Sequence, residues 1–139
     1  MNTNDVKQAR FRLKNYIITE TIVRLTGKTI GKDIQVGIAP KGKLNEKYKS
    51  FTLTLNVLVR DDKKNLNISL SIDGVFEYDT DSMQELLPFI CHNAPAILFP
   101  YIRAYISNIT ALGGIAPIIL PTLNLESVGK TLKDELEII

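Results

Sequence analysis

Few residues in this 139-residue chain could carry out catalysis, and the adjacent pair Cys91 and His92 is the first to consider. A thiol beside an imidazole could supply a nucleophile and its base. Neighbouring residues on a helix, however, point about 100° apart, so these two side chains do not align easily. A buried cysteine beside a surface histidine is the more ordinary interpretation. We therefore predict no catalytic residues and expect that the protein is not an enzyme.

The same inventory argues against a metal or cofactor site. The chain has a single Cys and a single His, so a zinc site would need several carboxylates, which is an uncommon ligand set. The acidic pairs Asp61-Asp62 and Asp79/Asp81 fit a turn and a helix start more simply. The Gly113-Gly114 pair precedes no Lys-Ser or Lys-Thr and so makes no phosphate-binding loop. We expect neither a metal nor a cofactor.

The charge of the chain is nearly balanced, at a formal net +2, which is too small to imply nucleic acid by itself. The basic residues do gather in one segment, at Lys41, Lys43, Lys47 and Lys49. With Pro40 and Gly42 in the same segment, a solvated loop is favoured over a patch that contacts phosphates. Nucleic acid is therefore not an expected partner.

The cysteine content and the hydropathy pattern favour a cytoplasmic protein. Cys91 has no second cysteine to pair with, and no basic-then-apolar leader opens the sequence. The apolar run from Ile97 to Leu123 raises the question of a membrane. Arg103, Asn108, a double glycine and three prolines within it argue against a spanning helix. We expect no membrane insertion.

The first half of the chain predicts antiparallel strands. Residues 51–59 and 66–72 alternate apolar and polar side chains with period two, which is typical of strands with one wet and one apolar face. The polar run Arg60–Asn65 between them has the composition of a hairpin turn.

Two weaker strands precede this hairpin. One covers about Phe11–Leu25 and bends near its middle, and the other covers Ile34–Ile38 and ends at Pro40. Four strands with short polar connections predict a four-stranded antiparallel sheet over about residues 11–78, arranged as a meander or a Greek key.

The second half changes to a helical period. Ser82 and Glu85 fit a capping box at the start of a helix. Pro88 and Pro95 then predict either two short segments or one kinked helix over residues 82–112. From Pro95 onward, apolar residues fall on one broad helix face, at Ile97, Leu98, Tyr101, Ile102, Tyr105, Ile106, Ile109 and Leu112.

The remaining elements complete an α+β fold. Gly113 ends the long helix, and an apolar crossover over residues 113–123 leads to a final helix over 124–137, which Asn124 can cap. Strands followed by helices predict helices packed on one face of an antiparallel sheet. The length favours a single domain over residues 1–139.

The crossover, residues 113–123, is the segment that bears most directly on function. Pro117 and Pro121 bar it from an ordinary helix or a central strand, although it is strongly apolar. Such a segment either fills its own core or covers a surface that binds something apolar. The candidate binding residues are Ile115, Ile118, Ile119, Leu120 and Leu123.

A distinctive block opens the long helix, and its members are Pro95, Ile97, Leu98, Phe99, Pro100, Tyr101 and Arg103. A helix, a glycine and the crossover follow this block, and the crossover leads into Asn124-Leu125. Upstream, Gly74-Val-Phe76 leads from the last strand to the helices. Together these features resemble the family of the bacterial protein-export chaperone SecB, whose signature is a Pro-x-Ile-Leu-Phe-Pro-Tyr-x-Arg block. The resemblance is specific from about Gly74 to Val128 and faint in the first half.

The resemblance implies a holdase, which is an ATP-independent chaperone that binds unfolded polypeptides during protein export. In that family the crossover forms part of the wall of a groove between sheet and helices, and the subunits assemble as a dimer of dimers. Burial of apolar surface stabilises contact by about 25 cal/mol per Å², so an exposed apolar strip can hold segments of many sequences. Within the block, we expect Arg103 to anchor the helix by hydrogen bonds before it contacts a client.

The chain also departs from the family pattern. SecB engages the SecA motor partly through carboxylates on the outer face of its sheet, and the matching positions here fall near Thr21 and Ser69, which carry no charge. Glu20 is adjacent, but a step of one residue turns a side chain to the opposite face. The resemblance therefore supports client binding more strongly than it supports delivery to SecA. SecB-like proteins also serve as dedicated chaperones of antitoxins, which is the competing interpretation.

Three hypotheses follow from the sequence. A SecB-like holdase predicts that charged replacements at Ile118 and Leu120 weaken suppression of client aggregation and leave the fold intact. A chaperone dedicated to one partner, such as an antitoxin, predicts tight binding of that partner and little effect on generic clients. A nucleic-acid binder that uses the lysine segment predicts binding that weakens steeply with salt.

Overall fold

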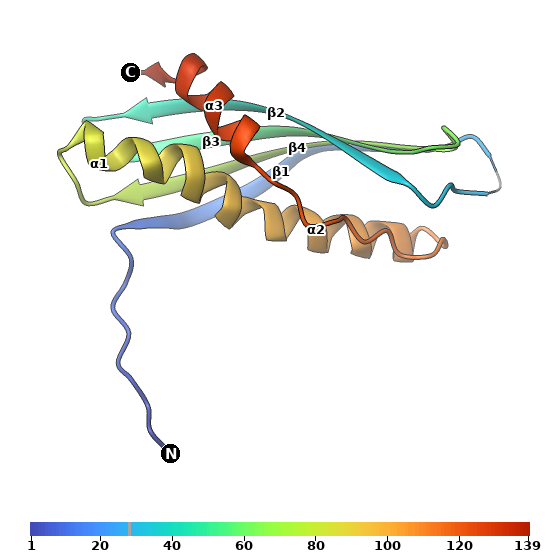
Figure 1. The fold of residues 1–139 in the computed structure, drawn as a ribbon, viewed down its shortest axis with the longest axis horizontal. Helices are drawn as coiled ribbons and strands as arrows, with labels where there is room; N and C mark the ends of the chain where they lie inside the picture. The colour runs from blue at the N-terminus through green and yellow to red at the C-terminus, as the bar shows by residue number, and fades with distance from the viewer. Residues whose placement is uncertain (28) are drawn as a thin grey trace.

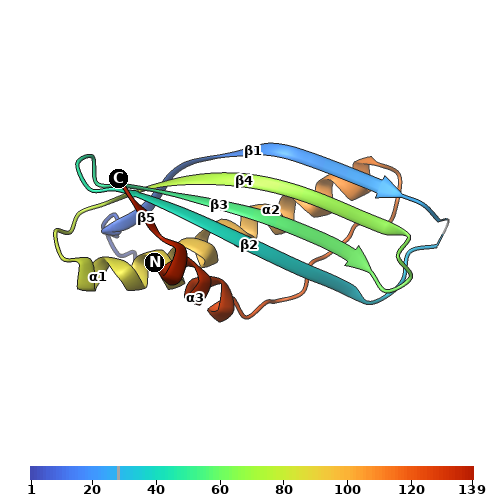
Figure 2. The same ribbon diagram turned by 90° about the horizontal axis from the view of Figure 1, so that it is seen from above.

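Long strands and a helical C-terminal part form two layers in the computed structural model, which describes residues 1–27 and 29–139 (Figure 1). The strands are β1 (Phe11–Leu25), β2 (Ile34–Asn45), β3 (Ser50–Asp61), β4 (Leu66–Tyr78) and the short β5 (Glu137–Ile138). The helices are α1 (Met83–Pro88), the π-helical segment η1 (Phe89–Asn93), α2 (Ala94–Leu112) and α3 (Glu126–Glu135). Figure 2 shows α2 crossing behind the sheet and α3 beside strand β2.

The sheet has five strands in the order β1-β4-β3-β2-β5. The first four are antiparallel, and β1 lies beside β4, so the three hairpin-connected strands β2, β3 and β4 complete a Greek key with it. The prediction of four purely antiparallel strands was wrong in one respect, because β5 pairs in parallel with Lys43 and Leu44 of β2. Two residues are too few to show a period of two, so the sequence pattern could not reveal this strand.

Strand β2 runs past Pro40 to Asn45, although the sequence predicted that it ends at Pro40. The carbonyl of Leu44 accepts a hydrogen bond from the N–H of Ile139, so the backbone groups of Leu44 point away from β3. Pro40 lies four residues before Leu44, so its backbone groups point in the same direction, away from β3. The N–H that proline lacks would therefore face the open edge of the sheet. Proline is tolerated at such an edge because no ladder bond is lost.

The core lies between the helices and the inner faces of β3 and β4. Alternate residues of both strands are buried, which confirms the period of two in their sequences. Gly74 lets α2 pass close to β4, because a Cβ atom at this position would lie 3.0 Å from a methyl carbon of Leu98. A side chain at position 74 would therefore require Leu98 to shift.

The helical layer is continuous from Met83 to Leu112, and the helix type changes between Pro88 and Pro95. At its start, Ser82 accepts a hydrogen bond from the N–H of Glu85 at 3.3 Å, which is one half of the predicted capping box. The other half is replaced, because the N–H of Ser82 donates to Thr80 Oγ1 at 3.2 Å and the Glu85 carboxylate accepts from the Thr80 hydroxyl at 2.9 Å. The widened turn η1 lies between Pro88 and Pro95, and the N–H of Ala94 bonds the carbonyl of Phe89, five residues back. This wider spacing is that of a π-helical turn.

Candidate functional site

The crossover returns along α2 in an extended, irregular path toward α3 (Figure 1). Gly113 closes α2 with a hydrogen bond to the carbonyl of Ile109 at 2.9 Å. Gly114 follows with a φ of 90°, a left-handed conformation that glycine adopts without strain, and this turn reverses the chain. The crossover therefore lies against the helix that precedes it.

Three consecutive residues of the crossover alternate between the interior and the solvent. Ile118 and Leu120 are 8% and 2% exposed, whereas Ile119 between them is 74% exposed. Ile115 and Leu123 are half-buried and pack against the core. The structure thus divides the predicted binding residues into two that fill the core, two at its margin, and Ile119 on the surface.

This division changes the test that the sequence suggested. Charged replacements at Ile118 and Leu120 were expected to leave the fold intact, but an unpaired charge at a buried position destabilises the whole protein. Ile119 is the position at which a charge can test binding without entering the core.

Arg103 ties α2 to the crossover. Its Nη2 donates to the carbonyl of Pro121 at 3.2 Å, and its guanidinium lies 5.2 Å from the centre of the Phe99 ring. Its Nε is buried and has no hydrogen-bond partner among residues 1–27 and 29–139. Arg103 therefore anchors the crossover.

The other members of the block serve mainly as core. Pro95, Leu98 and Phe99 are buried, Ile97 is half-buried, and Pro100 is exposed. Tyr101 is 41% exposed, and its ring centre lies 4.5 Å from that of Tyr16 on β1. Asn124 accepts a hydrogen bond through Oδ1 from the N–H of Glu126 at 2.9 Å, at the start of α3.

Strand β1 carries exposed apolar side chains on both of its faces, and the tyrosine pair lies on the face toward the helices. It lies at an edge of the sheet, and its large exposed side chains are Tyr16, Ile17, Ile22, Val23 and Leu25. An edge strand with many exposed apolar residues is a surface that proteins usually cover. The sequence analysis placed a strand here, but the burial of its residues could not be read from the weak alternation.

Two irregularities in β1 change which residues face the helices. The register with β4 shifts between Leu13 and Asn15 and again between Ile18 and Glu20. The second shift reverses the alternation that runs through Ile18, and Thr21 faces α2, where its hydroxyl lies 2.8 Å from that of Tyr105. Glu20 lies on the opposite face of β1 from Thr21.

The outer face of the sheet therefore carries carboxylates near the position where the sequence predicted none. Glu20 pairs with Ser71, and Asp73 on the same face accepts a hydrogen bond from Thr54 at 2.6 Å. The sequence analysis assigned Thr21 to this outer face and Glu20 to the opposite one, whereas in the structure Thr21 faces α2 and Glu20 lies on the outer face.

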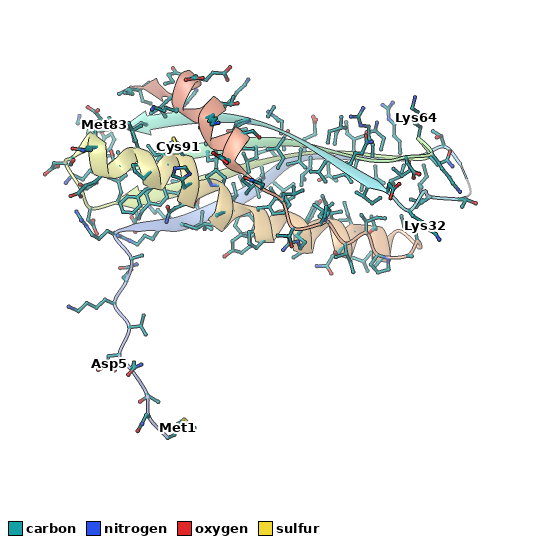
Figure 3. All side chains as sticks on the ribbon, in the orientation of Figure 1. Met1, Asp5, Lys32, Lys64, Met83 and Cys91 are labelled. Atoms are coloured by element: carbon teal, nitrogen blue, oxygen red, sulfur yellow. The ribbon has the colours of Figure 1, made fainter. Side chains whose placement is uncertain are left out.

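The pair Cys91 and His92 has the geometry of structural residues. Cys91, labelled in Figure 3, is buried in the helical layer, and His92 is exposed. Burial raises the pKa of the Cys91 thiol, and nearby Lys133 offsets this only in part. A thiol with a raised pKa is a poor nucleophile at neutral pH.

Asp61 is a structural carboxylate at the end of β3. It is 2% exposed and accepts hydrogen bonds from the N–H groups of Gly31, Asn65 and Leu66 at 2.7, 2.8 and 3.0 Å. Burial alone would raise the pKa of Asp61, but these donors outweigh it and hold the pKa below its usual value. Asp61 thus closes the loops at this end of the sheet.

The lysine segment is not one loop. Lys41 and Lys43 lie on the outer face of β2, and Lys47 and Lys49 lie in the following turn. The Nζ of Lys49 pairs with Asp81 at 2.9 Å, and this hydrogen bond raises the pKa of Lys49. The segment was expected to be a solvated loop, but half of it is strand because β2 continues through Pro40.

No helix among residues 1–27 and 29–139 has both the length and the hydropathy to cross a bilayer.

Comparisons with known proteins agree on one family. Residues 28–132 match the family model described as preprotein translocase subunit SecB. An uncharacterised protein of Methanocaldococcus jannaschii is 30% identical over 82% of this chain and 79% of its own length. The protein-export protein SecB of Roseobacter denitrificans is 33% identical over 69% of this chain but 58% of its own length, so the match covers little more than half of that relative.

Among solved structures, the fold resembles that of a Mycobacterium tuberculosis SecB-like chaperone in complex with a peptide from an antitoxin. The TM-score is 0.70 at 15% sequence identity, and the match covers 83% of this chain and 91% of that chain. This likeness concerns the fold.

Proposed function

Because the chain belongs to the family of the preprotein translocase subunit SecB, we propose that it is a holdase that binds unfolded polypeptides without ATP and acts in protein export. The observation that carries this proposal is Ile119, a large aliphatic side chain that the crossover holds 74% exposed. Ile115 and Leu123 of the same segment are half-buried. Residues 1–139 then act as one SecB-like domain, with the client lying against the crossover.

The size of this surface indicates how binding would work. Fully burying an aliphatic side chain contributes about 1.5–3 kcal/mol, so Ile119 alone supplies only a small part of the roughly 8 kcal/mol that micromolar affinity needs. Contacts from several subunits along one client would supply the rest, since linked weak sites bind far more tightly than each alone. The proposal therefore includes an oligomer.

The oligomer we propose is the homotetramer, a dimer of dimers, expected from the family. The exposed apolar residues of β1 and the pair of Tyr16 and Tyr101 supply one surface for it. A charge at Ile17, which is 62% exposed, should shift the mass measured by light scattering toward smaller species. An unchanged mass would place the subunit contact elsewhere.

We also place the protein in the cytoplasm, where the single thiol of Cys91 stays reduced.

We include binding to SecA in the proposal, because Glu20 and Asp73 place carboxylates on the outer face of the sheet. A direct titration of this protein with SecA tests that part, with Glu20→Gln as the variant expected to bind more weakly.

A chaperone dedicated to one partner, such as an antitoxin, is the second candidate. It is favoured by the narrowness of the crossover surface, because Ile118 and Leu120 face inward and Ile119 is left alone on the surface. A single anchor suits one matched segment better than many unrelated clients. This candidate predicts one polypeptide held through purification and little effect on the aggregation of generic clients.

The test of the holdase proposal uses two matched replacements. Ile119→Lys removes the apolar contact, and Val6→Lys makes the same type of change at a residue that is 90% exposed in the N-terminal segment, which extends away from the sheet (Figure 1). We expect Ile119→Lys to weaken suppression of the aggregation of a chemically unfolded protein, while Val6→Lys matches the wild type. Equal suppression by both variants would reject the crossover as the binding surface.

A further inference from the structure

Side chains of α2 hold the backbone of the crossover at two points, one on each side of Ile119. At the first point, Ile118 is bonded through both of its backbone groups. Its N–H donates to Thr110 Oγ1 at 2.9 Å, and its carbonyl accepts from Ser107 Oγ at 2.9 Å. At the second point, the carbonyl of Pro121 accepts from Arg103. These bonds replace the strand partners that an extended segment would otherwise need.

The three side chains form one line on α2. Residues 103, 107 and 110 are spaced by four and three positions, so they lie on one face of the helix. They are polar residues within a stretch whose other side chains on the buried face are apolar. Their spacing matches the extended chain that lies over them.

Thr110 can hold the crossover because it is 2% exposed and its hydroxyl forms hydrogen bonds with both α2 and the crossover. Its O–H has the carbonyl of Ile106 as acceptor at 2.7 Å, one helical turn back. That bond orients the hydroxyl and leaves a lone pair for the N–H of Ile118. A buried N–H without this acceptor would carry the full penalty of an unmade hydrogen bond.

The consequence is a fixed alternation of side chains. With Ile118 held at both backbone groups, its side chain points into the core, and that of Ile119 must point outward, because successive side chains of an extended segment alternate. The bond from Arg103 to Pro121 limits movement after Leu120.

We infer that Thr110, Ser107 and Arg103 are positioning residues for client binding, which hold the crossover so that Ile119 is presented to the client in a preformed orientation. The inference rests on the proposed holdase function. A preformed surface binds without first ordering a loop, so loss of the polar bonds lowers the fraction of molecules that can bind and raises the apparent Kd.

The test is a double-mutant cycle with matched variants of Thr110. Thr110→Val keeps the shape and removes the hydroxyl, whereas Thr110→Ser keeps the hydroxyl. The affinity of each variant is measured with and without Ile119→Ala, using reduced and carboxymethylated α-lactalbumin as the unfolded probe. Hydrogen exchange at the N–H of Ile118 reports on the bond itself.

In the wild type we expect Ile119→Ala to weaken probe binding severalfold. Thr110→Val should speed exchange at the N–H of Ile118 about tenfold, the factor that corresponds to a hydrogen bond of about 1.4 kcal/mol. In that background Ile119→Ala should weaken binding less than about twofold, because Ile119 is no longer held in place. Thr110→Ser should restore both values.

A merely structural role for Thr110 would leave the effect of Ile119→Ala equal in the two backgrounds, and that result overturns the inference while the holdase function stands. Absence of probe binding by the wild type overturns both. If Thr110→Val does not fold, Ser107→Ala removes the bond to the carbonyl of Ile118 from a half-buried position and is held to the same criterion.

Discussion

The substitution Gly129→Ala is the sharpest test of how α3 packs against the rest of the protein. Reasoning from the sequence and reasoning from the structure predict changes in stability of opposite sign. On an exposed helix, Gly→Ala stabilises by about 1 kcal/mol, since alanine has the higher helix propensity. In the structure, a Cβ at Gly129 would meet the carbonyl oxygen of Cys91 at 2.4 Å and its carbonyl carbon at 3.2 Å. Both atoms belong to the backbone of η1, which cannot rotate away as a side chain can.

The expected change in the free energy of unfolding combines the cost of the close contact with the gain in helix propensity. Overpacking of a tight contact costs about 1–3 kcal/mol, and subtracting the gain of about 1 kcal/mol in propensity leaves a destabilisation of up to about 2 kcal/mol. We expect Gly129→Ala to lower the free energy of unfolding measured in urea. Lys130→Ala is the control, because Lys130 is exposed on the same helix and its replacement should change stability by less than about 0.5 kcal/mol.

A second assay locates the effect. Cys91 is the single cysteine of the chain and is 8% exposed, so a thiol reagent reports on the exposure of this one position of η1. Gly129→Ala should raise the rate of labelling, because α3 must move away from η1. Increased stability together with unchanged labelling would refute the claim that α3 and η1 are in direct backbone contact.

The remaining predictions concern the crossover and the end of the sheet. Leu120→Ala should cost about 2–5 kcal/mol of stability, as truncation of a buried leucine does, whereas Ile119→Ala should cost less than about 0.5 kcal/mol; equal losses in urea denaturation would contradict the assigned burial. Because the folded-state pKa of Asp61 lies below its unfolded value, its carboxylate stabilises the fold above the unfolded pKa, and this contribution is lost as pH falls through the folded pKa. Asp61→Asn should therefore be less stable than the wild type at neutral pH, and the difference should disappear in acid; a difference independent of pH would contradict the assigned role.

Particular residues show how far the sequence could predict this fold. The strict alternation in β3 and β4 was enough to place both strands, because each has one buried and one exposed face. Strand β2 was cut short at Pro40, since whether a proline breaks a strand depends on which neighbour the strand has. That information belongs to the sheet and is absent from the local sequence.

The candidate site was likewise only partly predictable from the sequence. The prolines of the crossover predicted an irregular apolar segment, but nothing in the run of Ile118, Ile119 and Leu120 indicates which of them faces the core. Orientation is set by the hydroxyl of Thr110, eight residues away from the residue it holds. The face on which Glu20 lies also needs the structure, because the irregularity before Glu20 exchanges the two faces of β1.

The central claim is that an unfolded client lies against Ile119, and crosslinking from that position tests it most directly. A photoreactive phenylalanine derivative at position 119 should form adducts with an unfolded client, whereas the same group at the exposed position 6 should form few. The two positions have similar exposure, at 74% and 90%, so accessibility does not explain a difference. Bound client that forms adducts equally from both positions, or from neither, would contradict the account.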